Sequence, residues 1–484
     1  MINKSSFSFV FGSMKLISLP AKFFLALTIV PEPGITIHCM KDLSVGKESR
    51  LIFRFATPML LGNMFQQLYN VVDSIIVGKY IGKEALAAVG SSFPIIFTLI
   101  SFIIGIAIGS TVIISQFFGA KDFEKVKRAI DTLYIFIFFA SLFVSFLGIY
   151  FSTDIFHLIG LPEDIIPQAD SYLKIYLSGL VLFFGFNATS AILRGLGDSK
   201  TPLYFMIVAT IMNIGLDFLF VVGFGWGIEG AAFATIAAQG GAFITAIIYL
   251  NRTHEIINLS WRKMVFDKEL FRANIRIGLP IGLQQSFVAL SMMVMYWLVN
   301  PFGTNSVAAY SVVFRIDSFA AMPAMNFAAA LSTFVGQNLG ANKPERVRRG
   351  LISTAVMTSI FAFTISAIAL TMAGPLMRLF TNDAEVIAIG KEYLYTVSPF
   401  YVVFTVMFTI GGVMRGAGDT MVPMLITFVA LWIVRIPLCY YLSINMGILG
   451  IWWGIPMAWF TGAVLSFIYY LTGRWKTKAL VKYR

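Results

Sequence analysis

The chain carries little charge. Only 12% of its 484 residues are Asp, Glu, Lys or Arg, whereas 58% are hydrophobic. A soluble domain contains about 25% charged residues, so this composition excludes an ordinary water-facing surface. The apolar residues form runs of helical length without two-residue alternation, which favours an all-α membrane protein over a β-barrel.

Cysteine and histidine are also scarce. The two cysteines, Cys39 and Cys439, exclude a disulfide framework, and the three histidines are too scattered to form a metal site. Neither a nucleophile–base constellation nor a phosphate-binding loop is present, so we expect no enzyme, no cofactor and no nucleotide-driven pump. We attribute the net charge of +12 to basic cytoplasmic loops rather than to nucleic-acid binding.

Apolar spans follow Arg50, each about 20 residues or longer, as a bilayer core of roughly 30 Å requires. We expect twelve transmembrane helices, near residues 52–78, 86–116, 130–152, 168–192, 202–223, 230–250, 276–300, 307–335, 351–373, 388–411, 421–443 and 449–471. Every second loop is rich in Lys and Arg, as at 121–128 and 343–349, so the positive-inside rule places both ends of the bundle in the cytoplasm.

Residues 1–49 do not fit this pattern. Their apolar patch, "FFLALTIVPEPG", is too short to span a bilayer comfortably. It is a signal-like segment, a loosely held extension or, as we favour, sequence that precedes a translation start at Met40. We expect residues 1–40 to be functionally silent.

The rest of the chain repeats itself. "QFFGAKDFEKVKR" from Gln116 matches "QNLGANKPERVRR" from Gln337, and "RGLGDSKTP" from Arg194 matches "RGAGDTMVP" from Arg415, both at an offset of 221 residues. Each copy holds six spans, an even number, so the two copies enter the bilayer from the same side. We therefore predict two six-helix lobes, 50–272 and 273–484 with a basic tail, related by a pseudo-two-fold axis along the membrane normal.

An aspartate interrupts the first span in "QQLYNVVDSIIVGKY". A carboxylate at the centre of a membrane helix costs about 2.5–3.5 kcal/mol on insertion scales, so Asp73 needs a reason. Asp73, Asp217 and Thr235 each lie six residues from the predicted outer end of their span, a depth of ~9 Å. Asn213 precedes Asp217 by one turn. We expect these residues to form a cluster that binds a proton or a small cation; a structural hydrogen-bond network is the alternative.

The second lobe does not copy the acids, because the positions equivalent to Asp73 and Asp217 hold Val294 and Leu438. Asp317 and Arg315 in the eighth span are expected to pair with each other. Arg435 in the eleventh span needs a partner or a water-filled cavity, and its role stays open.

Four motifs together resemble the multidrug and toxic compound extrusion family, over nearly the whole chain from Arg50. They are "NVVDSIIVG", Gly109–Gln116, the two "RGxGD" loops, and Asn213–Thr235. The resemblance is to the DinF-type bacterial branch of the family, and it implies a cation site at Asp73, Asn213, Asp217 and Thr235. It also implies a helix bend at Pro58. The seventh span lacks the acid that the NorM-type branch carries there. We place the substrate cavity at Gln66, Tyr69, Asn70, Gln284 and Gln285.

The resemblance implies a secondary active multidrug efflux antiporter. Such a protein exports amphipathic, often cationic compounds in exchange for H⁺ or Na⁺ by alternating access, and we expect it to act as a monomer in a bacterial inner membrane. The alternative is a flippase of lipid-linked oligosaccharides from the same superfamily. A channel fits less well, because no charged ring or carbonyl filter is visible. The sequence decides neither the exported compound nor H⁺ against Na⁺.

Overall fold

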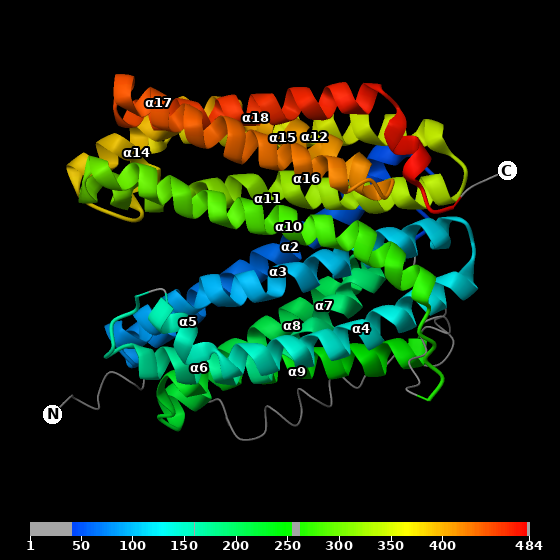
Figure 1. Cartoon of the computed structure of the whole chain (residues 1–484), viewed down its shortest axis with the longest axis horizontal. Helices are drawn as coiled ribbons and strands as arrows, with labels where there is room; N and C mark the ends of the chain where they lie inside the picture. The colour runs from blue at the N-terminus through cyan, green and yellow to red at the C-terminus, as the bar shows by residue number, and fades with distance from the viewer. Residues whose placement is uncertain (1–40, 159, 254–261, 482–484) are drawn as a thin grey trace, which may run out of the picture.

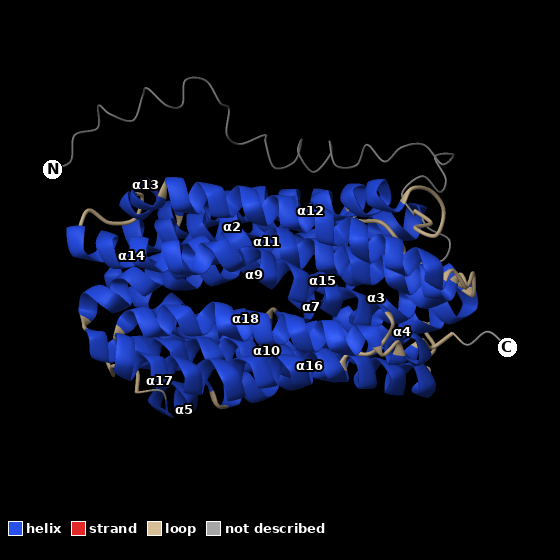
Figure 2. Ribbon diagram, turned by 90° about the horizontal axis from the view of Figure 1, so that it is seen from above, coloured by secondary structure: helices blue, strands red, loops and turns tan. Residues whose placement is uncertain are grey.

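The computed structural model describes residues 41–158, 160–253 and 262–481. These residues form helices joined by loops and turns and contain no strand. Two helical lobes lie side by side (Figure 1), and their helices run along one long axis with the loops gathered at the two ends (Figure 2). The first lobe comprises α2 (Glu48–Tyr80), α3 (Lys83–Gly119), α4 (Phe123–Tyr150), α5 (Ser152–Leu158), α6 (Ile166–Ser178), α7 (Leu180–Gly195), α8 (Lys200–Asp217), the π-helical η2 (Phe218–Gly223) and α9 (Gly227–Thr253).

The second lobe repeats this order. It comprises α10 (Lys268–Val299), η3 (Asn300–Phe302), α11 (Thr304–Gly340), α12 (Pro344–Thr371), α13 (Ala373–Arg378), α14 (Ala384–Val397), η4 (Ser398–Phe400), α15 (Tyr401–Gly416), α16 (Met421–Phe428), the π-helical η5 (Val429–Arg435), α17 (Ile436–Met446), α18 (Ile448–Leu471) and η6 (Arg474–Lys478). Its first helix, α10, begins before the predicted lobe boundary at residue 273.

Most of the predicted spans are apolar helices. In the described part of the chain, ten helices are long and apolar enough to cross a membrane, or eleven when α6 and α7 count as one span bent by 51°. The remaining predicted span, α2, has 33 residues but is less apolar, because Asn63, Gln66, Gln67 and Asn70 occupy its middle. Among the helices of span length that the structure describes, the least apolar is therefore the one that carries Asp73.

The two lobes touch through glycines. A Cβ atom on Gly105 of α3 would lie 2.4 Å from the backbone nitrogen of Gly282 on α10. At the end of α3, a Cβ on Gly119 would lie 2.1 Å from the carbonyl oxygen of Gln337, and one on Gly340 would lie 1.9 Å from that of Gln116. Small residues allow the helix backbones to approach this closely, as is common between membrane helices.

Two buried glutamines cross between the lobes where α3 and α11 end. Gln116 Nε2 donates to the Gly416 carbonyl (3.0 Å), and Gln337 Nε2 donates to the Gly195 carbonyl (3.1 Å). Gln116 and Gln337 are equivalent positions of the sequence repeat, as are Gly195 and Gly416. The two hydrogen bonds are therefore related by the pseudo-two-fold axis. The amide oxygens accept from the two ends of the described chain: Gln337 from Leu43 N (2.8 Å) and Gln116 from Leu480 N (2.7 Å). We call these four hydrogen bonds the glutamine latch.

The repeated "RGxGD" loops are built around this latch. Their first glycine supplies the carbonyl that accepts from the glutamine of the other lobe. Their second glycine, Gly197 or Gly418, has a left-handed φ of +82° or +89°, which favours glycine. The aspartate of the first loop, Asp198, accepts from the backbone nitrogens of Lys200 and Thr201 at the start of α8 (2.9 and 3.1 Å). The first loop thus both caps the start of α8 and takes part in the contact between the two lobes.

The latch lies at the end of the bundle that holds the basic loops 121–128 and 343–349 and the C-terminal segment, which we call the basic end (Figure 1). Residues 41–47 of the predicted N-terminal extension pack there. Leu43 is buried, Lys343 Nζ donates to the Ser44 carbonyl (3.0 Å) and Arg346 to that of Gly46 (2.7 Å). Residues 1–40, which we expected to be silent, lie outside the described residues.

Replacing both Gln116 and Gln337 by methionine tests the latch. The change keeps most of the side-chain volume but leaves buried carbonyl and N–H groups unpaired, so we expect a loss of about 1–3 kcal/mol in unfolding free energy at each site. The basic end should also open more often. Thermal unfolding and the distance between spin labels at residues 125 and 345 measure the two effects.

The control is Gln67→Met, because the Gln67 amide bonds to Asn70 on its own helix. Equal melting and equal label distances in the double variant and the wild type would show that the glutamines do not hold the lobes together.

Candidate cation-coupling site

Three helices of the first lobe contribute the predicted cation residues. Asp73 lies on α2, Asn213 and Asp217 on α8, and Thr235 on α9, and all four are buried. Asn213 Nδ2 donates to Thr235 Oγ1 at 3.4 Å, while Thr235 Oγ1 donates to the Ala231 carbonyl of its own helix (3.1 Å). The carboxyls of Asp73 and Asp217 are near enough to interact electrostatically.

Several buried oxygen atoms of this region have no hydrogen-bond donor. Asp73 Oδ1, Asn213 Oδ1, both carboxyl oxygens of Asp217 and Gln239 Oε1 are buried without a hydrogen-bond partner among the described residues. A buried acceptor without a donor costs about 1–3 kcal/mol, and more when it is charged. Carboxylate and amide oxygens are the ligands of hard cations, and a carboxylate also takes a proton. The site therefore has the chemistry to hold either ion.

A π-helical turn follows Asp217 directly, as η2. Such turns interrupt α-helical hydrogen bonding and often occur at functional sites. Across from η2, a Cβ on Gly230 of α9 would lie 3.1 Å from the backbone carbon of Phe220, so α9 packs closely on this turn. The close packing keeps Thr235, five residues further along α9, beside α8.

Gln239 is part of this region, and our sequence analysis missed it. It follows Thr235 by one helical turn, so the two residues share a face of α9, and its side chain is 4% exposed. Tyr69 of α2 connects the parts, because it interacts with Asp73, Asp217 and the Gln239 side chain. The spacing from Thr235 was the available signal.

Helix α2 belongs to both lobes. Ile52, Phe55, Ala56 and Met59 pack in a hydrophobic cluster with α11 of the second lobe, whereas Ile76 and Val77 pack in the core of the first lobe. Pro58, the predicted bend, lies within the part of α2 that packs on α11, directly before Met59. A proline removes one helical hydrogen bond, so α2 is weakened near the end of the part that packs in the second lobe.

The residues predicted to line a substrate cavity are half-buried, apart from the buried Tyr69. Asn70 Nδ2 donates to Gln67 Oε1 on its own helix (3.2 Å). Gln284 Nε2 donates to Thr427 Oγ1 on α16 (2.7 Å), so this amide is used within the second lobe. Gln66 and Gln285 lie on α2 and α10.

The predicted pairing of Asp317 with Arg315 is wrong. The Asp317 carboxylate accepts from the hydroxyls of Tyr393 and Tyr401, the latter at 2.5 Å, while the side chain of Arg315 is exposed. Residues two apart on a helix do not face each other, which is why the pair does not form. Arg435 acts electrostatically on Asp317, and its Nε is buried without a hydrogen-bond partner in the described chain.

Two lobes of apolar helices, with buried carboxyls held between helices of one lobe, define a multi-pass membrane transport protein. The comparisons with known proteins agree. The chain belongs to the MatE family, whose model matches it twice, over residues 58–219 and 280–441, once in each lobe. Members of this family are transporters and not enzymes, and several are named as multidrug resistance proteins.

Among the relatives is the "Probable multidrug resistance protein YoeA" of Bacillus subtilis, 33% identical over 88% of this chain and 94% of its own length. "Probable multidrug resistance protein YpnP" of the same organism is 32% identical over 91% and 98%. A solved structure described as "MATE in the bent conformation" has a TM-score of 0.86 at 23% identity, covering 92% of this chain and 98% of its own. These findings confirm the family and the two-lobe fold.

Gln239→Leu tests the residue that the structure adds to the region. Removing one amide worth about 1 kcal/mol should raise the ion concentration for half-maximal transport roughly fivefold. The maximal rate at saturating ion should change little. Thr245→Val on the same helix is the control, because its hydroxyl donates to the Gly241 carbonyl (2.7 Å). An unchanged ion dependence would remove Gln239 from the site.

Proposed function

We propose that this protein is an antiporter that exports amphipathic, often cationic compounds in exchange for H⁺ or Na⁺. The ion binds at Asp73, Asn213, Asp217 and Thr235. The observation that carries the proposal is the set of buried oxygens without donors, because a proton or cation supplies what they lack. The multidrug resistance names of the relatives support the substrate class.

Alternating access would follow from how the lobes meet. The glutamine latch and the glycine contacts close the basic end. Further hydrogen bonds join the lobes near mid-helix, from Asn63 to Asn326 (2.8 Å) and between Ser101 and Ser286 (3.2 Å). If the basic loops face the cytoplasm, as positive charge favours, this arrangement is the outward-facing state. The protein then acts as a monomer in the bacterial inner membrane, since one chain contains both lobes.

Coupling would pass through α2. Ion binding neutralises the Asp73 and Asp217 carboxyls. This neutralisation changes how the half of α2 that carries Asp73 packs against α8 and α9. Because the other half of α2 packs in the second lobe, a bend at Pro58 alters the contact between the lobes. A local change of charge would thus shift a two-state equilibrium between lobe arrangements.

Asp73→Asn and Asp217→Asn test the coupling site. The asparagine amide is neither protonated nor deprotonated near neutral pH, and it carries no charge to hold Na⁺. We expect efflux of a fluorescent cation such as ethidium to fall at least about tenfold, equivalent to ~1.4 kcal/mol. Efflux is measured from cells energised in turn by a pH gradient and by a Na⁺ gradient, and the gradient that drives the wild type identifies the ion.

Asp170→Asn is the matched control in the same lobe. Its carboxylate is already satisfied by Lys174 (2.7 Å), Ser152 (2.5 Å) and Thr153 (3.0 Å). Export by Asp73→Asn at the wild-type rate would make that acid architectural and sink the proposed mechanism.

Pro58→Ala tests the bend. Alanine restores the missing helical hydrogen bond and favours a straight α2 by up to ~3 kcal/mol. We expect turnover to fall about tenfold, with little change in the ion concentration for half-maximal transport. Pro280→Ala is the control, since it also removes a proline from a helix interior, in α10 of the other lobe. Equal slowing in both variants would argue against a special role for Pro58.

A further inference from the structure

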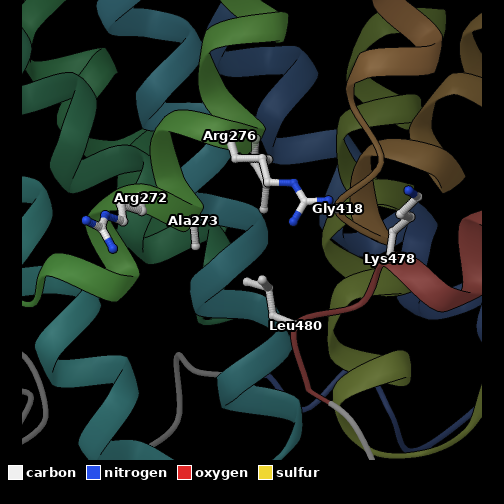
Figure 3. Close-up of a pocket in the computed structure, with 7 residues that line it drawn as sticks. Arg272, Ala273, Arg276, Gly418, Lys478 and Leu480 are labelled. Atoms are coloured by element: carbon white, nitrogen blue, oxygen red, sulfur yellow. The ribbon is translucent and has the colours of Figure 1, made fainter.

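A small pocket at the basic end lies beside the latch. It has a volume of about 240 Å³ and forms between the first turns of α10, the loop at Gly418 and the C-terminal segment (Figure 3). Arg276 extends its guanidinium toward Gly418, Lys478 lies on the other side of that loop, and Arg272 points away from both. The lining is completed by Ile277 and Leu480, with Ala273.

The charge of this pocket has one sign. The residues that line it include three cations and no acid, and none of the three cations has an ion-pair partner in the part of the chain that the structure describes. Arg276 and Lys478 are both exposed. Both cations suit a phosphate, since arginine binds its oxygens in a fork and lysine adds a point charge.

An exposed apolar face runs from Arg276 along α10. Leu279 is 40% exposed and Leu290 47%, and at 1.5 Å per residue Leu290 lies roughly 21 Å along the helix from Arg276, about the thickness of one leaflet. Their helical spacing places them on the side of α10 that carries Arg276, and such a face is the part of a membrane helix that meets acyl chains. A ligand with a phosphate and an acyl chain matches both features, whereas a free phosphate uses only the first.

We propose that the pocket binds the phosphate of an anionic phospholipid, held by Arg276 with Lys478 as a second cation, and that an acyl chain lies along the exposed face of α10. The bound lipid joins α10 to the C-terminal segment, whose Leu480 N–H is held by Gln116 of the first lobe. Gly418, in the floor, lies against the same glutamine: a Cβ there would be 3.7 Å from Gln116 Nε2. Occupation therefore stabilises the closed latch. The choice of leaflet rests on the proposed orientation, with the basic end at the cytoplasm.

The test uses the full chain in nanodiscs of phosphatidylcholine, with and without phosphatidylglycerol. Native mass spectrometry counts retained phosphatidylglycerol, and thermal unfolding measures its stabilising effect. We expect the wild type to retain the lipid and melt several degrees higher with it. Arg276→Gln with Lys478→Gln should lose most of both effects, and each single variant should lose part. Neither readout requires transport, so failure here is distinguishable from failure of the antiporter proposal.

Lys263→Gln with Arg348→Gln is the control. These exposed cations also lie at the basic end, outside the pocket, and their replacement removes the same charge. An equal loss in the control would show a general surface-charge effect and overturn the proposal, as would a full lipid effect in the pocket variant. Inorganic phosphate is added in a separate arm in phosphatidylcholine alone. If it reproduces the stabilisation, the ligand is free phosphate and the lipid assignment is wrong.

Discussion

The structure depends on the absence of water around polar groups in the membrane interior, where each such group needs a partner from the protein. Gln116 and Gln337, which are buried at the basic end, are satisfied in the same way, because both ends of each amide are bonded across the lobes or to a terminal segment. Asp73 Oδ1 and both carboxyl oxygens of Asp217 have no such partner among the described residues. One set of polar groups therefore holds the lobes together, and the other is left open to an ion.

These two sets are linked mechanically by α2. Its basic-end half packs with Phe327 and Phe334 of α11, and its other half carries Asp73 beside α8. A helix confined to one lobe would relax within that lobe when its charge changed. Because α2 is shared, the proposed change would act on the interface between the lobes, and Pro58 lies within the part of α2 that packs on α11.

The repeat in the sequence predicted the two lobes, because equal offsets of six spans fix both their number and their relation. Helical rise placed Asp73, Asp217 and Thr235 at one depth, but depth says nothing of rotation about a helix axis. The repeat matched Gln116 with Gln337 and Gly195 with Gly416, yet the hydrogen bonds cross between copies, and similarity of copies does not reveal contact between them. Tyrosine donors for Asp317 were equally hidden, since they lie on distant helices.

Both lobes contain a π-helical turn beside a charged residue, which is acidic in the first lobe and basic in the second. In the first lobe a π-helical turn begins directly after Asp217; in the second, a π-helical turn of the corresponding span ends at Arg435. The acid of the second lobe, Asp317, already has two hydroxyl donors, whereas Asp217 has none in the described chain. Duplication thus supplied the same scaffold twice, but among the described residues only the first copy keeps buried carboxyl oxygens without a donor. Under the proposed mechanism, an ion bound in the first lobe would change one side of the interface alone, and this asymmetry would allow its binding to move one lobe relative to the other.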